Sequence, residues 1–488
     1  MTTQTTNRVE YYAILFACVV AALQLLTLNH PGLNADEALN LLLVPEAKRY
    51  FAEGGLTTNP LLPYAGPVHF WFLGALNALV SGFFTSVRAS AWLFRLAPFL
   101  LFCVAARYLW LEVRKHDRLL GALLPFVLAG MPIMLVYGKA GFGQSILLSL
   151  SCFLLAESLR ISRTEQVRFG RLAFFMGLAI DVHPMAICGI AGILLPVRIH
   201  VSRAIRERPG LFAAAEVLLI FICYPVIRNF IAGLPMSGDA GVNIVREIRN
   251  FLNTVSGQQP MAFWLSGVDR TPTVLVVVGL GILLAAFYFY VREKKSEVNP
   301  TVRALFWTHA GMTLVMLVMS HFWRSLEVLG NERYFVALAP GWAVVSAAAF
   351  MQLGKRYRPV WGFAAGWGGL QAARFFLQVL PLLGQSDPNK LAARWLIDNC
   401  PVDYCVAYAE NFANYWPIRY YSSFDRIELN VLRDNWKTQP QFSAAGKDVA
   451  GCWSPHSERM YKGTFKNIRE FPASDSESGV LCFKGITL

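Results

Sequence analysis

The sequence predicts a polytopic α-helical membrane protein with juxtamembrane helices in its first outer loop and a small α/β soluble domain at its C-terminus. Of the 488 residues, 55% are hydrophobic and only 15% are charged, whereas about a quarter of an average soluble protein is charged. Apolar runs long enough to cross a bilayer recur up to residue 381. The net charge of +13 then reflects the basic loops that orient a membrane protein rather than nucleic-acid binding.

Nine apolar runs are predicted to be full spans. They cover residues 11–28, 88–111, 119–137, 144–160, 211–228, 273–291, 303–320, 334–353 and 360–381. The run from Leu172 to Val197 is interrupted by Asp181, His183 and Pro184, which predicts two short helices in a hairpin that starts and ends on one side. The apolar stretch 67–84 is expected to pack at the outer surface. A further span there would put the next basic loop, with Arg114, Lys115 and Arg118, on the outer side.

Charge sets the predicted orientation. Five short loops carry 18 basic residues, and with nine spans and a closed hairpin all five fall on the side of Arg8. That side is cytoplasmic by the positive-inside rule. The loops 29–87 and 229–272 and the tail then lie outside the plasma (inner) membrane. The chain therefore divides into a membrane domain, 1–383, and an extracytoplasmic domain, 384–488. Four tail cysteines (Cys400, Cys405, Cys452 and Cys482) could form two disulfides there, with the pairing open.

The first outer loop holds the main candidate site. Asn34 and Glu37 have the spacing of a capping box, so Asp36 and Glu37 are expected at a helix N-terminus against the outer membrane face. One interpretation is that the acids only cap the helix, since acids are favourable in a first turn. The other is a catalytic carboxylate that reaches a lipid-linked substrate at the interface.

Five motifs in order carry a resemblance to a family. They are DEALNLL (36–42), GPVHFWFLGALNALVSGFF (66–84), RASAWLFRLAPFLL (88–101), RLAFFMGLAIDVHPMAI (171–187) and ERYFVALAPGWAVV (332–345). This pattern resembles the GT-C glycosyltransferases, in the branch of the protein O-mannosyltransferases and the lipid A aminoarabinose transferases. The resemblance implies transfer of a sugar from a polyprenyl-phosphate donor to an acceptor on the outer, periplasmic side, with Asp36 as general base. It also puts the hairpin turn at Asp181 and His183 near the cytoplasmic half.

The chemistry needs one base and cationic partners for the departing phosphate. Retention of the anomeric configuration would need a second carboxylate close to Asp36. Glu37 is the only adjacent one, and neighbouring residues on a helix face different ways, so inversion is favoured. Candidate substrate-binding residues are Arg333, Lys139, Gln144, His69 and Tyr64. Gln144 stands where relatives often carry an acid, and Gly66 where many carry a lysine. The histidine spacing matches no zinc motif, and no cofactor is predicted, although a divalent metal stays open.

Other functions stay open on the sequence alone. A transporter or flippase of a lipid-linked glycan, a noncatalytic binder of lipid-linked sugars, and a ligase with a lipid diphosphate donor are the alternatives. A transporter would favour charges and broken helices at the midplane in two matching halves, and only one such break is seen, at 181–184. In the tail, 390–400 is predicted to be an amphipathic helix, and CVAYAE and RIELNVL to be strands. The acceptor, whether glycan, lipid or protein, and the sugar are not specified.

Overall fold

The computed structural model describes most of the membrane segments and parts of the tail. The described residues are 3–28, 37–38, 87–141, 143–183, 185–231, 273–292, 299–322, 332–357, 361–384, 387–400, 405–409, 412–422, 429–431, 448–453, 465–472 and 481–487. The chain forms two compact units, one made of residues 1–28, 47–79 and 92–378 and the other of residues 29–46, 80–91 and 379–488.

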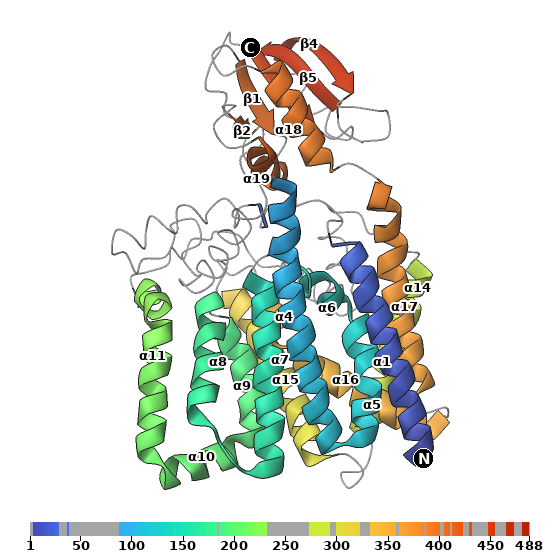
Figure 1. Cartoon of the computed structure of the whole chain (residues 1–488), viewed down its shortest axis with the longest axis vertical. Helices are drawn as coiled ribbons and strands as arrows, with labels where there is room; N and C mark the ends of the chain where they lie inside the picture. Colours follow the sequence, from blue (N-terminus) through green and yellow to red (C-terminus); the bar gives the residue numbers. More distant parts are fainter. Residues whose placement is uncertain are drawn as a thin grey trace. The chain divides into compact units, whose positions relative to one another are not determined.

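The first unit is a bundle of helices (Figure 1). Its elements are α1 (Thr3–Leu26), α4 (Val87–His116), α5 (Arg118–Gly130), α6 (Pro132–Tyr137), α7 (Gly143–Thr164), α8 (Phe169–Val182), α9 (Ala186–Leu194), η1 (Leu195–Val197), α10 (Arg198–Glu207), α11 (Pro209–Ile231), α14 (Thr273–Arg292), α15 (Pro300–Phe322), η5 (Glu332–Ala337), α16 (Ala339–Tyr357) and α17 (Gly362–Val379). Among the described residues, five helices are long and apolar enough to cross a membrane. The predicted polytopic helical fold is confirmed.

Helices occupy every predicted span, but two spans are divided. The run 119–137 breaks between α5 and α6 at Met131, which is extended with ψ 123°. Pro132 follows it, and a proline disfavours helical geometry in the residue before it. The run 334–353 divides into the 3₁₀ helix η5 and α16. The prediction of one continuous helix in each place was therefore wrong.

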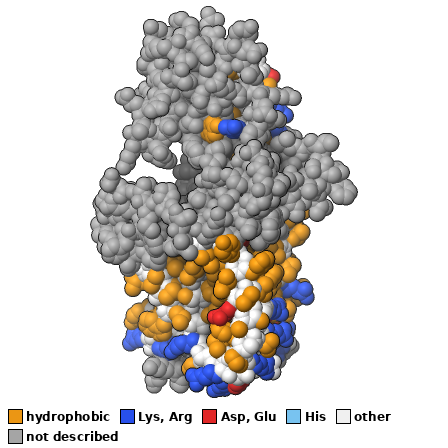
Figure 2. Space-filling view, turned by 90° about the vertical axis from the view of Figure 1, so that its left-hand side faces the viewer, with side chains coloured by type: hydrophobic (Ala, Val, Ile, Leu, Met, Phe, Trp, Pro, Cys, Tyr) orange, Lys and Arg blue, Asp and Glu red, His pale blue; other side chains and the backbone are white. Residues whose placement is uncertain are grey.

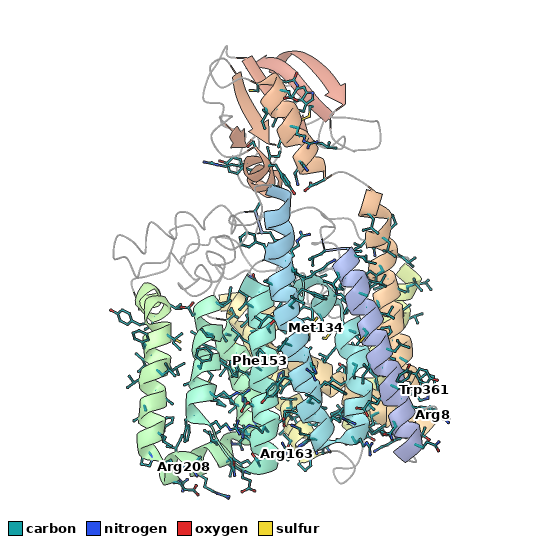
Figure 3. All side chains as sticks on the ribbon, viewed as in Figure 1. Arg8, Met134, Phe153, Arg163, Arg208 and Trp361 are labelled. Carbon is teal, nitrogen blue, oxygen red and sulfur yellow. A yellow bond between two sulfur atoms is a disulfide. The ribbon has the colours of Figure 1, made fainter. Side chains whose placement is uncertain are left out.

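The basic loops meet at one end of the bundle, here called the basic end. Arg118 donates to Asn7 at 2.6 Å and Arg114 pairs with Glu10 at 2.6 Å, which joins the α4–α5 turn to the start of α1. Two hydrogen bonds lead to the start of α15. His116 in the α4–α5 turn bonds to Asn299 at 3.0 Å, and Ser162 near the end of α7 bonds to Thr301 at 2.6 Å. Figure 3 shows Arg8, Arg163 and Arg208 at this end, and Figure 2 shows Lys and Arg gathered below an apolar belt.

The segment 169–197 forms the predicted hairpin. Its two ends meet at the basic end, where Phe169 and Val197 share one buried apolar cluster, and Ser158 of α7 donates to Ile193 O at 2.7 Å. The 14 residues of α8 rise about 21 Å at 1.5 Å per residue, more than half of a core about 30 Å thick. The turn at His183 therefore lies in the half opposite the basic end (Figure 1). The positive-inside rule predicts that the basic end is cytoplasmic, so this place disagrees with the one that the family resemblance implies for the turn.

Two glycines allow α5 and α17 to touch through their backbones. A Cβ on Gly368 would contact the carbonyl oxygen of Phe126, and one on Gly130 would lie 2.8 Å from the carbonyl carbon of Gly368. Small residues let membrane helices approach this closely.

We expect Gly368→Ala to destabilise the bundle by about 1–3 kcal/mol, because the added methyl group forces the two backbones apart. Gly366→Ala on the same helix is the control, since a Cβ there meets nothing within 4 Å. Thermal unfolding in detergent measures both variants. Equal unfolding temperatures for the two would contradict the close contact.

Among its described residues, the tail part of the second unit contains the 3₁₀ helix η6 (Leu380–Gly384), two α-helices and a mixed sheet. α18 (Pro388–Asn399) and α19 (Phe412–Tyr421) accompany β1 (Cys405–Ala409), β2 (Leu429–Val431), β3 (Asp448–Trp453), β4 (Phe465–Pro472) and β5 (Leu481–Thr487). The strand order is β2-β1-β3-β5-β4. Strand β1 is parallel to its neighbours β2 and β3, whereas β5 is antiparallel to its neighbours β3 and β4. Helix α18 and strands β1 and β2 lie where the sequence predicted a helix and two strands. That the tail is a separate soluble domain from residue 384 stays a prediction.

A disulfide joins two strands of the sheet. Cys452 of β3 is bonded to Cys482 of β5, directly opposite it in the antiparallel register. Cys400 at the end of α18 is also disulfide-bonded. Around these residues the unit has its own apolar core, which includes Ala393, Leu396 and Ile418.

Candidate functional site

Two buried cations hold the end of α1, at the end of the bundle opposite the basic end. Lys139 Nζ donates to Thr27 O at 3.0 Å and to Thr27 Oγ1 at 3.1 Å. Arg95 Nη1 donates to Leu28 O at 2.7 Å. The last carbonyls of a helix lack partners within it and carry partial negative charge, so cations stabilise them. These contacts fix the position of the end of α1.

Lys139 was predicted to bind substrate from a short outer loop. It does lie between α6 and α7, but its side chain is fully buried, so it is not a solvated loop charge. Its ammonium group also lies 5.2 Å from the centre of the Phe375 ring on α17. A cation–π contact of this kind is stronger when it is desolvated. The positive charge of Lys139 thus links the α6–α7 connection to the end of α1 and to α17.

Gln144 and Arg333 lie on elements that pack together near Lys139. Gln144 is in the first turn of α7 and is 9% exposed. Arg333 is the second residue of η5, and its side chain lies outside the described residues. Because η5 packs against α6 and α7, the structure brings the segments of Lys139, Gln144 and Arg333 to one part of the bundle.

The remaining predicted site residues belong to the first outer loop. Asp36, Tyr64 and His69 lie outside the described residues. Glu37 is described and is fully buried within the second unit. The catalytic and binding roles predicted for these four residues stay predictions.

Two arginines near this end were missed by the sequence reasoning. Arg95 is 2% exposed and Arg374 of α17 is 1% exposed, and Arg374 Nη1 donates to Gln371 Oε1 at 3.2 Å. Arg374 directly precedes Phe375, the residue that faces Lys139. The available signal was an arginine inside an apolar run, which in a membrane protein marks a functional site by default.

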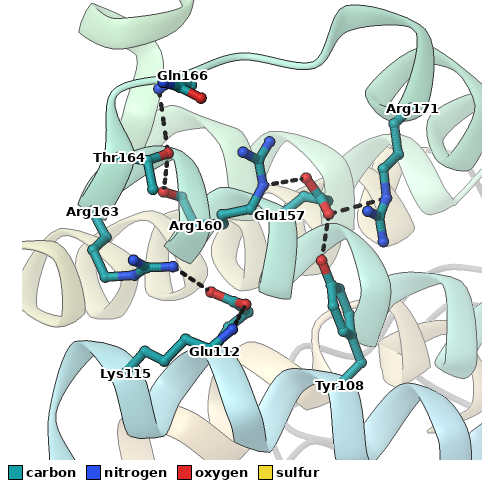
Figure 4. A network of polar contacts seen from close by, with 9 residues as sticks. All are labelled: Tyr108, Glu112, Lys115, Glu157, Arg160, Arg163, Thr164, Gln166 and Arg171. Carbon is teal, nitrogen blue, oxygen red and sulfur yellow. Dashed lines mark hydrogen bonds and ion pairs between the residues drawn. The ribbon is translucent and has the colours of Figure 1, made fainter.

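No cluster of three or more metal-ligating side chains (His, Cys, Asp or Glu) occurs within the described ranges. One acid of the described membrane helices, Glu157, has a structural role. Glu157 of α7 is fully buried near the basic end, where it accepts from Tyr108 at 2.7 Å, Arg160 at 2.8 Å and Arg171 at 3.1 Å (Figure 4). This network ties α4, α7 and α8 together.

Glu157→Gln is expected to lower the free energy of unfolding by about 3–5 kcal/mol, because it leaves the charges of Arg160 and Arg171 without their carboxylate. The matched control is Glu165→Gln, which breaks the 3.1 Å pair with Arg203 between side chains that are 60% and 58% exposed. Exposed pairs contribute little, so the control should change stability by less than about 0.5 kcal/mol. Chemical denaturation compares them, and similar losses would refute the assigned role of Glu157.

Comparison with known proteins identifies the fold. No protein-family profile and no curated protein matches the sequence. Among solved structures, ArnT from Cupriavidus metallidurans in the apo state superposes with a TM-score of 0.56 and 13% identity over 97% of both chains. The same protein bound to undecaprenyl phosphate superposes with a TM-score of 0.56 and 14% identity over 97% of this chain and 98% of that chain.

An oligosaccharyltransferase from Archaeoglobus fulgidus in the apo form overlaps more weakly, with a TM-score of 0.46 and 13% identity over 88% of this chain and 65% of that chain. The likeness to ArnT extends over nearly the whole of both chains and agrees with the order of the sequence motifs. The chain therefore has the fold of the GT-C membrane glycosyltransferases.

Proposed function

We propose that the chain is an integral membrane glycosyltransferase. It moves a sugar from a polyprenyl-phosphate donor to an acceptor on the outer, periplasmic side of the plasma membrane, with inversion at the anomeric carbon. The observation that carries the proposal is the fold shared over 97% of the chain with an ArnT structure bound to undecaprenyl phosphate. The buried cations at the end opposite the basic loops support it, because a polyprenyl-phosphate headgroup is an anion at the membrane surface.

The proposed reaction is a single displacement. Asp36 removes the proton from the acceptor hydroxyl, the oxygen attacks the anomeric carbon, and the bond from this carbon to the phosphate oxygen breaks. Phosphate leaves as a stable anion, so no general acid is needed. Lys139, Gln144, Arg333, Tyr64 and His69 form the proposed binding set, and Glu37 supports the helix start beside Asp36.

The orientation is part of the proposal. The basic end faces the cytoplasm with the N-terminus by the positive-inside rule. Helix α17 runs from that end to the opposite one, so the segment that follows begins outside. The Cys452–Cys482 disulfide supports this, because disulfides form and persist in oxidising compartments. The proposed domains are a membrane domain, 1–383, and an extracytoplasmic domain, 384–488.

The test uses the full chain in proteoliposomes with a panel of polyprenyl-phosphate sugars and a membrane extract as the source of acceptor. Release of polyprenyl phosphate together with a glycosylated product is the expected result for at least one sugar. Sugar lipid that crosses the bilayer without being cleaved would indicate a flippase instead. Binding of sugar lipid with neither cleavage nor translocation would indicate a noncatalytic binder.

A further inference from the structure

A cavity of about 370 Å³ lies between α1, α4, α5 and α6. Its walls are almost entirely apolar and include Ala17, Ala21, Phe102 and Leu128. Gln24 lies at one end and donates from Nε2 to Leu135 O at 3.1 Å. At the other end, nearer the basic end, lie Arg107 and Trp110.

The cavity has the length of one bilayer leaflet. On α1 its lining residues run from Ile14 to Gln24, which is about 15 Å at 1.5 Å per residue. Half of a hydrocarbon core about 30 Å thick is also about 15 Å. Trp110 marks the lower limit near the basic end, where its Nε1 donates to Gly121 O at 3.0 Å in the first turn of α5. At its other end the lining reaches Gln24 and Leu135, about one helical turn from Thr27 and Lys139.

The mouth of the cavity faces the surrounding bilayer. Three lining residues, Ile14, Cys18 and Arg107, are exposed on the outside of the bundle. On α4 the apolar side chains of Leu100 and Val104 beside them are 51% and 60% exposed. An apolar mouth between two membrane helices admits hydrocarbon and excludes polar solutes, so its occupant comes from the membrane itself.

Arg107 supplies the headgroup end of the site. It is exposed one turn before Trp110 and has no ion-pair or hydrogen-bond partner within the described part of the chain. The neighbouring cation Arg114 is already paired with Glu10 at 2.6 Å. A charged side chain within a membrane helix is costly unless it reaches a partner. A lipid phosphate at this depth would be that partner, since basic pockets between helices on the cytoplasmic side bind anionic lipid headgroups.

We propose that this cavity binds an anionic phospholipid whose headgroup lies toward the basic end and whose acyl chain extends along α1 toward the middle of the bilayer. Its phosphate pairs with Arg107, Trp110 lies at the headgroup level, and one acyl chain fills the cavity between α1 and α4. The headgroup end of this site, at Arg107 and Trp110, lies away from the proposed binding set around Lys139, and its occupancy does not depend on sugar transfer.

The test is native mass spectrometry of the delipidated full chain, titrated with phosphatidylglycerol, phosphatidylcholine or undecaprenyl phosphate. We expect phosphatidylglycerol to bind at least about fivefold more tightly than phosphatidylcholine, as one basic residue near the surface contributes about 1 kcal/mol. Arg107→Gln should remove that preference and Arg107→Lys should keep it. Ala21→Phe should fill the cavity and weaken phosphatidylglycerol binding by a similar factor.

Two controls separate the site from general effects. Ala22→Phe adds the same ring to an adjacent exposed position on α1, and Arg206→Gln removes an exposed cation from α10 at the same end; both should leave affinity unchanged. Equal affinities for the wild type, Arg107→Gln and Ala21→Phe would overturn the proposal. So would undecaprenyl phosphate binding more tightly than phosphatidylglycerol and losing affinity in Ala21→Phe, because the cavity would then hold a polyprenyl tail.

Discussion

Asp36→Asn is expected to lower the rate of sugar transfer by at least about 100-fold while the donor still binds. The amide keeps the shape of the carboxylate and can still cap a helix, but it cannot accept the proton of the acceptor hydroxyl. A positioned general base contributes typically about 10²–10⁴-fold to a rate, so the loss should appear in kcat and not in the KM for the donor. Single-turnover transfer with excess enzyme measures the chemical step.

Glu37→Gln is the matched control for Asp36→Asn. Glu37 is buried and adjacent in sequence, so its substitution tests whether any loss of charge in this segment abolishes transfer. We expect it to reduce stability more than the chemical step. If Asp36→Asn transfers sugar at the wild-type rate, Asp36 only caps the helix and another residue is the base.

Lys139→Met is expected to have the second largest effect. The substitution removes the charged hydrogen bonds to Thr27, measured at 3.0 and 3.1 Å, and leaves the carbonyl oxygen buried. A hydrogen bond to a charged group contributes about 1.5–3 kcal/mol, so the loss of both bonds should lower the free energy of unfolding by at least about 1.5–3 kcal/mol. Transfer should fall about 10-fold or more, because the segment that carries Asp36 follows this point and Lys139 belongs to the proposed binding set for the donor phosphate.

Lys355→Met provides the comparison for Lys139→Met. Lys355 is exposed in the last turn of α16, at the basic end, so its loss should change neither stability nor transfer. Denaturation curves measure the stability of both variants, and transfer assays measure their rates. Wild-type behaviour of Lys139→Met would show that neither the end of α1 nor the donor depends on this charge.

The sequence predicted the helices of the bundle well, because their signal is local. Apolar runs of sufficient length mark the spans, and basic residues mark the loops that gather at one end. The helix breaks at Met131 and between η5 and α16 were harder to predict. Pro132 accounts for the first break, but a proline in an apolar run can kink, end or begin a helix, so the sequence alone did not decide among these outcomes. The hairpin was predicted from Asp181, His183 and Pro184, but the depth of its turn depends on how α8 and α9 pack.

The contacts of the candidate site could not be predicted, because they join distant parts of the chain. Thr27 and Lys139 are 112 positions apart, and Leu28 and Arg95 are 67 apart. A lysine in a short loop has the same sequence pattern whether it is solvated or buried. Its burial follows from the approach of α17 through Phe375, which is a tertiary property. The order of the motifs, by contrast, was sufficient to predict the GT-C fold.

The anomeric configuration of the product tests the account most directly. The purified full chain is given a ¹³C-labelled polyprenyl-phosphate sugar of known configuration, and the transferred sugar is examined by nuclear magnetic resonance. A single displacement assisted by Asp36 predicts that the product has the opposite configuration and that Asp36→Asn forms almost none of it. A product with retained configuration, or no transfer from any polyprenyl-phosphate sugar, would contradict the proposed mechanism.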